Sequence, residues 1–586
     1  METKSKVKGG GGALSRKDLT RPKKDPLLNE LKTNEVKNES RFRRYQSWLL
    51  DNGCLFPSLD YPVAFWKEGV VGVLAKQDIP PNKAFVFIPY NITINLNTDS
   101  DVLNQIYEEN EYFFSVHSES SSHRMYLILM YERMKGTESF WFPYFEVIGE
   151  TETILDWTEE EKTQLQDPFI VYESNLWTQR YQKKFSQISE ILSEYPYIFP
   201  PLRDLKELFT WALRVFNTRA FGWEGRMLIP LADNINHSNV DVVYHTFFKD
   251  DPDSPVEVDF SDFTGKASPT NKPLRFKTNL SRLEKYIKAT SDKKPIKSLN
   301  AIWEVDRLLG EFSSSSDEET VKNLWEVQSD PPESSEEEEE TYLGQEECYF
   351  TLYTGEKCSF KKGSQIFSSY GKLSNRDLLL DYGFAMMNNN YDSFYFRMWN
   401  KSTGRQGLVT LEDLEASDYK NELHSATLDD FTDLFGLKYT RLNCEVFTYF
   451  RQLEDTDVVL KASPSDIELE LRISDKVLEL YYGFERTFTT SIEEDLSRLD
   501  KGARGKLRYA LIYRSSLKRI LKKQIDMVNK LKEILEQVNS GEPLRNHLKS
   551  KSLSEVREVY PLKAYLKSLR ANLNQASIEE VPPLES

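Results

Sequence analysis

One stretch decides the fold of this chain: Leu228-Ile229-Pro230-Leu231-Ala232-Asp233-Asn234-Ile235-Asn236-His237-Ser238. Its proline and its run of small and polar side chains predict a tight turn, which Asp233 is expected to close. Taken alone, Asn-His-Ser after such a turn is typical of an ordinary loop with a hydrogen-bonded histidine. The stretch gains its meaning from three further segments that flank it along the chain.

Those three segments are equally short. Thr218-Arg219-Ala220-Phe221 precedes the turn, just after a helix predicted over residues 205–216. Ser369-Tyr370-Gly371-Lys372-Leu373-Ser374-Asn375-Arg376 follows it and runs into Leu380-Asp381-Tyr382-Gly383-Phe384. Nearer the N-terminus, residues 67–78 contain the turn Gly69-Val70-Val71-Gly72.

Short β-rich runs surround these segments. They are punctuated by glycine and by the pair Pro80-Pro81, and they lie at 63–66, 70–74, 85–88, 92–94, 226–248, 349–353 and 365–370. Such runs predict several short strands in small sheets, not one parallel α/β sheet. Apolar residues at helical spacing predict helices over 41–52, most of 102–217, and 506–538. The expected fold class is therefore α+β.

The chain is expected to divide into three parts. Residues 1–38 are polar and Lys-rich and predict a disordered tail, whereas residues 39–390 predict one domain with a helical insert at about 100–215. A second insert, at about 251–345, is too polar to bury a core and is expected to be disordered. Residues 391–586 predict an all-α domain.

The net charge of −17 is concentrated in one place. Residues 304–347 hold sixteen acidic and two basic residues, so the rest of the chain is nearly neutral. The overall charge therefore says little about the partner of this protein.

Several function classes are disfavoured by what the sequence lacks. None of the four cysteines forms a C-x-x-C pair and no H-E-x-x-H occurs, so we expect neither a disulfide frame nor a metal site. No apolar run approaches the roughly 18 residues of a membrane helix, and no apolar signal core is present. We therefore expect a cytoplasmic location, with the nucleus left open. The run Gly9–Gly12 lacks the strand and spacing of a nucleotide loop.

The helix predicted over 506–538 is rich in basic side chains: Arg514, Lys518, Arg519, Lys522 and Lys523. These residues could form a nucleic-acid surface. The favoured interpretation is a helix that packs on a bundle and keeps a basic outer face. We expect a monomer that acts on a protein, without a membrane or nucleic-acid partner.

The segments quoted above, taken together and in this order, resemble the SET-domain methyltransferases. The likeness is to the branch of the Rubisco large-subunit lysine methyltransferase, which includes ribosomal-protein lysine methyltransferases and an actin-histidine methyltransferase. It covers about residues 40–390. Beyond residue 390, only helical character matches the C-terminal substrate-binding domain of that family. The resemblance implies S-adenosylmethionine as cofactor and a protein as substrate.

The resemblance also implies a cofactor site spread over separate segments. Arg219 would face the carboxylate of the cofactor in a charge-assisted pair, and Asn236 would hold its amine through the amide oxygen. His237 would bind the adenine edge through its main chain, and Phe384 would pack nearby. Ser374 and Asn375 would cap the next helix, with their backbone near the cofactor. The full implied set is Gly69, Val70, Val71, Arg219, Asp233, Asn236, His237, Tyr370, Ser374, Asn375 and Phe384.

Tyr370 is the implied catalytic residue. The reaction is a direct displacement, in which a neutral amine attacks a methyl group on a sulfonium, so alignment of the reacting atoms dominates. A tyrosine hydroxyl can orient that amine without becoming charged. Tyr244 and Tyr382 are expected to line the channel that leads to it.

Two positions favour lysine over histidine as the target. Relatives that methylate histidine carry asparagine two residues after the arginine and tryptophan just before the aspartate, where this chain has Phe221 and Ala232. Phe221 cannot hydrogen-bond an imidazole, and Ala232 leaves room for a long flexible side chain. These two residues are the expected substrate contacts.

Several alternatives stay open. They are a histidine methyltransferase of the same branch, a non-catalytic scaffold, and a histone-directed enzyme, although no Cys-rich flanking module supports the last. The substrate protein, the number of methyl groups added and the role of the charged insert are left open as well.

Overall fold

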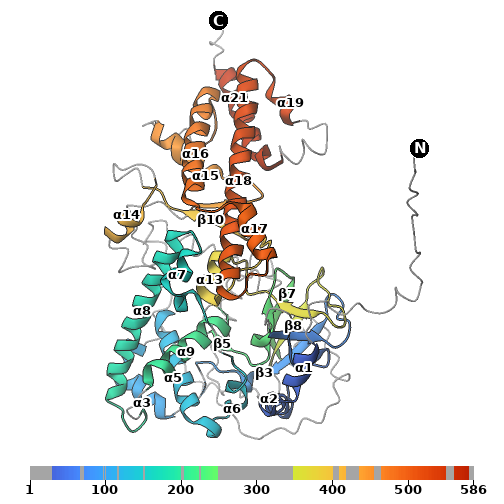
Figure 1. Ribbon diagram of the computed structural model, residues 1–586, viewed down its shortest axis with the longest axis vertical. Helices are drawn as coiled ribbons and strands as arrows, with labels where there is room; N and C mark the ends of the chain where they lie inside the picture. Colours follow the sequence, from blue (N-terminus) through green and yellow to red (C-terminus); the bar gives the residue numbers. More distant parts are fainter. Residues whose placement is uncertain are drawn as a thin grey trace, which may run out of the picture. The chain divides into compact units, whose positions relative to one another are not determined.

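A computed structural model describes most of the chain. The described residues are 30–65, 71–96, 98, 101–114, 118–149, 152–199, 204–222, 226–248, 348–399, 408–416, 435–454, 463–548 and 560–579. They fall into two units, and Figure 1 labels many of their helices and strands. The first unit takes the described residues of 30–149, 192–248 and 348–371, and the second takes those of 152–191 and 372–579. Within this described part of the chain, no helix is long and apolar enough to cross a membrane.

The first unit contains small sheets of short strands, as predicted. The strand orders are β1-β2-β9-β6, β3-β8-β7 and β4-β5. The strands are β1 (Leu59–Phe65), β2 (Val71–Ala75), β3 (Ala84–Pro89), β4 (Ala220–Phe221), β5 (Met227–Leu228), β6 (Asn236–His237), β7 (Val242–Phe248), β8 (Cys348–Thr354) and β9 (Gln365–Ser368). Strands β7 and β8 pair antiparallel over their full length, so the chain resumes its sheet directly after residues 249–347. The predicted charged insert itself lies outside the described residues.

Helices make up the rest of the first unit. They are α1 (Glu30–Lys37), α2 (Ser40–Asp51), α3 (Asp101–Glu109), α4 (Glu111–Phe114), α5 (Ser118–Met134), α6 (Phe142–Phe145) and α9 (Leu205–Arg219). Helix α9 buries Phe209, Ala212, Leu213 and Phe216, which recur at the spacing of one helix face. Its last residue, Arg219, leads directly into strand β4.

Helix α1 corrects one expectation. The prediction of a disordered tail through residue 38 is wrong for residues 30–38, and residues 1–29 lie outside the described part. Thr33 and Val36 are buried, and Lys37 Nζ lies 2.7 Å from an Asp60 carboxylate oxygen. In a helix of two turns, Thr33 and Val36 are enough to form a buried face. The segment is otherwise polar, so its composition gave no sign of a packed helix.

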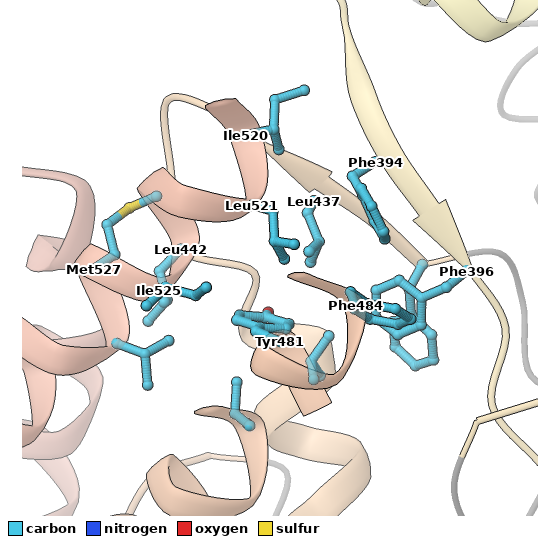
Figure 2. Close-up of a cluster of buried hydrophobic side chains, with 14 of the residues drawn as sticks. Phe394, Phe396, Leu437, Leu442, Tyr481, Phe484, Ile520, Leu521, Ile525 and Met527 are labelled. Carbon is cyan, nitrogen blue, oxygen red and sulfur yellow. The ribbon is translucent and has the colours of Figure 1, made fainter. Parts of the chain in front are cut away.

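The second unit is helical around one apolar core. Its helices are α7 (Glu159–Thr163), α8 (Pro168–Ser193, up to Ile191), α13 (Asn375–Tyr382), α14 (Leu411–Ala416), α15 (Cys444–Glu454), α16 (Ile467–Thr487), α17 (Ile492–Asp500), α18 (Gly505–Asn539), α19 (Leu544–Leu548) and α21 (Lys563–Glu579). Figure 2 shows Leu521 and Ile525 of α18 packed against Tyr481 of α16. The predicted helix over 506–538 is thus the long central helix of this unit.

Two strands interrupt the helices of the second unit. Strands β10 (Ser393–Phe396) and β11 (Phe435–Lys438) pair antiparallel. The C-terminal region is therefore mainly helical, whereas an all-α domain was expected. Phe394 and Phe396 are two residues apart, so they lie on the same face of β10. Both side chains point into the apolar core beside Phe484 (Figure 2). A four-residue strand is too short to stand out in a sequence that reads as helical on both sides.

Helix α13 begins and ends with clear local signals. Ser374 caps its N-terminus and exchanges hydrogen bonds with Asp377 in a capping box. Gly383 ends it with φ of +76°, a left-handed conformation that favours glycine. A side chain at residue 383 would also lie closer than 3.0 Å to the backbone of Glu152 and Thr153. Two independent constraints therefore require glycine at this position.

We predict that Gly383→Ala destabilises the second unit by about 3 kcal/mol or more, because conformational strain adds to a clash with backbone that cannot move aside. Gly502→Ala is the matched control, since Gly502 has φ of +90° in the same unit but no atom within 4 Å of an added side chain. That control should lose only about 1 kcal/mol. Urea unfolding followed by circular dichroism measures both, and equal losses would contradict the backbone clash.

Candidate active site

The turn at Leu231 is held in a strained shape by a distant helix. Leu231 has φ of +76°, which costs a non-glycine residue on the order of 1 kcal/mol. Its backbone N–H donates to the hydroxyl of Tyr45, a fully buried residue of α2, at 2.7 Å. Ala232, the next residue, is fully buried and begins the short 3₁₀ helix Ala232–Asn234. Helix α2 thus fixes the backbone that leads to Asp233.

Asp233 accepts hydrogen bonds from two other helices. The Tyr144 hydroxyl of α6 donates to its Oδ2 at 2.7 Å, and Arg219 Nη1 of α9 lies 3.0 Å from the same oxygen. Arg219 Nη1 also donates to the backbone carbonyl of Asp233 at 3.2 Å. Burial raises the pKa of the Asp233 carboxyl, and the adjacent Arg219 guanidinium opposes this shift. The turn is therefore tied to α6 and α9 by one carboxylate.

This ion pair leaves two buried atoms unmatched. Within the described residues, Arg219 Nε and Asp233 Oδ1 are buried and have no hydrogen-bond partner. Buried polar atoms without partners are rare, since each costs about 1–3 kcal/mol. One unmatched donor and one unmatched acceptor thus lie at the same pair, where a further polar group would find hydrogen-bond partners.

Asn236 joins the turn to strand β2. Its Nδ2 donates to the carbonyl oxygen of Val71 at 2.6 Å, which leaves Oδ1 as the remaining polar atom of the amide. Gly72 lies so close that a side chain there would come within 3.0 Å of Asn236 Nδ2 and of Gln365 Nε2. Glycine at position 72 therefore allows this close approach of backbone and amide. Gly69 and Val70, the other residues predicted here, lie outside the described residues.

His237 fixes the backbone of Tyr370. Strand β6 pairs parallel with β9, and the Tyr370 N–H donates to His237 Nδ1 at 3.0 Å. Since Nδ1 accepts this bond, the neutral ring carries its proton on Nε2. Burial lowers the pKa of His237 to about 4, so the ring is neutral near pH 7. The ring of His237 thus has a structural role that was not predicted, and the main-chain contact with adenine stays a prediction.

Tyr370 is held by its hydroxyl as well as by its backbone. The hydroxyl donates to the carbonyl oxygen of Ile235 at 3.1 Å, and the ring lies 5.1 Å from that of His237. Burial raises the pKa of Tyr370 to about 12, although Arg219 opposes this shift. The hydroxyl therefore stays protonated near pH 7, with lone pairs that can accept a hydrogen bond from an incoming group.

An aromatic cluster contains two of the predicted pocket residues of the first unit, Phe221 and Tyr244. Phe221 meets Tyr244 edge-on at 5.8 Å between ring centroids, and Phe350 completes the set at 5.4 Å from Phe221 and 5.6 Å from Tyr244. Phe350 was not predicted. It lies in β8 beyond the charged stretch, where its alternation with Leu352 indicates only a core position.

The remaining predicted residues lie in the second unit. Ser374 caps α13 as expected, and Asn375 is fully buried, with its amide bonded to Asp392 and to the backbone of Met386. Tyr382 and Phe384 contact each other across the helix end, with ring centroids 6.3 Å apart. The contacts of these four residues with a cofactor or channel stay predictions.

Sequence reasoning missed the two tyrosines that support the turn. Tyr45 and Tyr144 lie on helix faces where an aromatic residue is usually core, and no local pattern links either of them to Asp233. No group of three or more metal-ligating side chains occurs in the part of the chain that the structure describes.

Known proteins resemble this chain over only part of its length. No family model matches the chain. The ribosomal lysine N-methyltransferase set10 of Schizosaccharomyces pombe is 25% identical over 220 residues, which are 34% of this chain and 38% of that protein. An actin-histidine N-methyltransferase of Callithrix jacchus is 25% identical over 219 residues, 35% of this chain and 36% of that protein. The matched region thus spans less than two fifths of these curated relatives.

Solved structures match over a much longer stretch. The SET domain of LSMT bound to lysine and AdoHcy aligns with a TM-score of 0.52 and 18% identity, covering 85% of this chain and 92% of that one. Rubisco LSMT bound to AdoMet aligns with a TM-score of 0.51 and 17% identity, covering 85% and 94%. The chain therefore has the SET fold of these structures, as the resemblance of the motifs predicted.

We predict that His237 makes the stability of the first unit depend on pH. Its pKa is lowered in the folded state, so the unfolded chain takes up a proton first as the pH falls below about 6.5, and stability falls towards pH 4. The effect should reach about 2–3 kcal/mol. Compared with His237→Gln, the wild-type protein should have its largest advantage in melting temperature above pH 6.5, and that advantage should shrink towards pH 4. A difference that is constant with pH would contradict this assignment.

Proposed function

We propose that this protein is an S-adenosylmethionine-dependent protein-lysine N-methyltransferase that acts on a non-histone protein. The observation that carries the proposal is the arrangement of Arg219, Asp233, Asn236, His237 and Tyr370 in a SET fold. Arg219 pairs with Asp233, Asn236 donates to Val71, and His237 accepts a hydrogen bond from Tyr370. Two solved proteins of this fold were bound to AdoMet and AdoHcy, and the partial relatives are named as protein methyltransferases. The absence of a Cys-rich module from the sequence supports a non-histone substrate.

The unmatched atoms of the site fit the amino-acid end of that cofactor. Arg219 Nε is a buried donor that a carboxylate would satisfy in a charge-assisted bond. Asn236 Nδ2 donates to Val71, and this bond orients the amide, whose Oδ1 can accept from an ammonium group. Gly72 keeps the neighbouring backbone free of a side chain at this point. These residues would hold the cofactor, which supplies a methyl group on a positively charged sulfur.

The protein's own part in the reaction is to orient the attacking amine and keep it neutral. Tyr370 is held at its backbone by His237 and at its hydroxyl by Ile235, so the hydroxyl has one fixed direction. Its lone pairs can accept a hydrogen bond from the amine nitrogen, which aligns that nitrogen for displacement. With a pKa of about 12 the phenol stays neutral, and an apolar channel at this point would disfavour the ammonium form of the substrate.

Lysine is the favoured target because of the residues at the two predicted substrate positions, Phe221 and Ala232. Phe221, Tyr244 and Phe350 contact one another, and Phe221 offers no hydrogen bond to an imidazole. Ala232 is fully buried and takes little space. A histidine methyltransferase is the second candidate, since the partial relatives include one enzyme class of each kind.

Methyl transfer can be tested without knowing the substrate. The purified protein is incubated with labelled S-adenosylmethionine and a cell extract, and the labelled proteins are hydrolysed to amino acids. We expect label in methyl-lysine. Label confined to methyl-histidine would contradict the lysine assignment, and no label together with no cofactor binding would indicate a scaffold.

We predict that Tyr370→Phe lowers kcat by about 10²–10³-fold, because the amine loses the group that orients it. The affinity for the cofactor should change by less than about threefold, because the substitution removes only the hydroxyl. Tyr482→Phe, an exposed residue of the second unit, is the control and should have wild-type kcat. If Tyr370→Phe kept wild-type kcat, the tyrosine would not be catalytic.

We also predict that Arg219→Gln weakens binding of S-adenosylmethionine by about 10–100-fold in calorimetry, because a charge-assisted bond is lost. Arg44→Gln removes an exposed arginine of the same unit that pairs with Glu146, and it should bind normally. Since Arg219→Gln also leaves Asp233 unpaired, Asn236→Ala gives a second variant that keeps the ion pair. Normal binding by both site variants would place the cofactor elsewhere.

A further inference from the structure

The basic stretch of helix α18 divides into two groups with opposite surroundings. Arg514 and Lys518 are buried, and both bond to the carboxylate of Asp495, at 2.5 Å and 2.6 Å. Arg514 also donates to the backbone carbonyl of Gln164 at 2.8 Å. These two cations hold helices of the second unit together, so the expectation of one basic outer face is wrong for them.

The other three cations of this stretch are less buried than Arg514 and Lys518. Lys522 is exposed, and Arg519 and Lys523 are half-buried. Arg519 reaches away from the helix, because its Nη1 donates to Asn388 Oδ1 at 3.3 Å and its guanidinium lies 5.9 Å from the centroid of the Tyr439 ring. Arg519 therefore contacts two separate segments, one at Asn388 and one at Tyr439.

A buried glutamine fixes one of those loops beside the helix. Gln524 Nε2 donates to the carbonyl oxygens of Lys438 and Arg441, at 2.6 Å and 2.7 Å. The side chains of Lys438 and Arg441 are themselves exposed. The Gln524 side chain therefore holds the segment that carries these two cations against α18.

We call this region the basic-aromatic surface. Its residues are Met387, Asn388, Tyr391, Lys438, Tyr439, Arg441, Arg519, Lys522 and Lys523. Three of its apolar side chains are unusually exposed: Met387 at 40%, Tyr391 at 37% and Tyr439 at 48%. None of its five cations forms an ion pair within the part of the chain that the structure describes. The nearest acidic residue along α18 is the exposed Asp526.

We propose that the basic-aromatic surface binds an acidic segment of a partner protein that also carries apolar side chains. Among the described residues, these five cations outnumber the one exposed carboxylate beside them on α18, Asp526, and so create a positive potential that attracts carboxylates. Met387 is a flexible apolar side chain suited to contacts with aliphatic or aromatic residues, and exposed tyrosines are frequent anchors at protein interfaces. The proposal goes beyond methyl transfer and does not depend on it.

A nucleic acid fits this surface less well. Binding of single strands relies on aromatic rings with free faces on which bases stack. Arg519 already lies over the Tyr439 ring, so one face of that ring is taken. Three consecutive asparagines and Met387 also interrupt the positive charge, whereas a phosphate backbone favours a continuous basic track.

The test measures binding of short probes to the full-length protein by fluorescence anisotropy. The first probe is a labelled peptide of about fourteen residues in which glutamates alternate in pairs with leucine and phenylalanine. The others are the same peptide with serine for the apolar residues, the same peptide with lysine for glutamate, and a single-stranded RNA of similar length. Each is titrated at about 50 mM and about 300 mM salt, across which surface charge attraction is increasingly screened.

We expect the first peptide to bind most tightly, and its affinity to fall at the higher salt. The double variant Arg519→Glu/Lys523→Glu should weaken it by at least about tenfold, since two attractive contacts become repulsive. Lys501→Glu/Arg504→Glu is the matched control, with the same charge change on exposed residues before the start of α18, and it should change affinity by less than about twofold.

Three results would overturn the proposal. One is an equal loss in both double variants, which would mean that only the overall charge matters. Another is tighter binding of the RNA through Arg519 and Lys523, which would make the surface a nucleic-acid site. The third is no binding of the first peptide up to about 1 mM, the affinity range of the weakest specific contacts.

Discussion

The buried ion pair of Arg219 and Asp233 is the interaction on which the rest of the first unit depends. It joins the end of α9 to the turn after β5, and Tyr144 adds α6 to the same carboxylate. Removal of either charge would leave the other buried and unpaired, which costs several kcal/mol. The pair therefore sets the position of the turn, and the strained backbone at Leu231 persists because Tyr45 and Asp233 hold it from both sides.

The turn at Asp233 also positions the residues that follow it, Asn236 and His237. Once Asp233 is fixed, β6 can pair with β9 over only two residues, Asn236 and His237. A pairing this short has little stability of its own, so the side-chain bonds of Asn236 to Val71 and of His237 to Tyr370 complete it. The neutral state of His237 is essential here, because a protonated ring could not accept the Tyr370 N–H.

The sequence was sufficient for the α+β class, for most strands and for the long helix α18, because these depend on local periodicity. It was also sufficient to bring Arg219, Asp233, Asn236, His237 and Tyr370 into one site, through a resemblance carried by short strings. It was insufficient where an effect depends on contacts between distant residues. Tyr45, Tyr144 and Phe350 look like core residues until the fold brings them to the turn and to the aromatic cluster. The burial of Arg514 and Lys518 could not be predicted either, since their partner Asp495 lies in another helix.

The two unmatched atoms of the ion pair have a consequence for the lifetime of the protein. Without a ligand, Arg219 Nε and Asp233 Oδ1 carry a cost of burial that no residue of the described chain offsets. A ligand that satisfies one of them binds the folded state alone, so it raises the free energy of unfolding by RT ln(1 + [L]/Kd). At about 100 times its Kd this amounts to about 2.7 kcal/mol, a large part of the stability of a typical domain. On the proposed function, the supply of the methyl donor would then govern how much of this protein stays folded, as well as how fast it works.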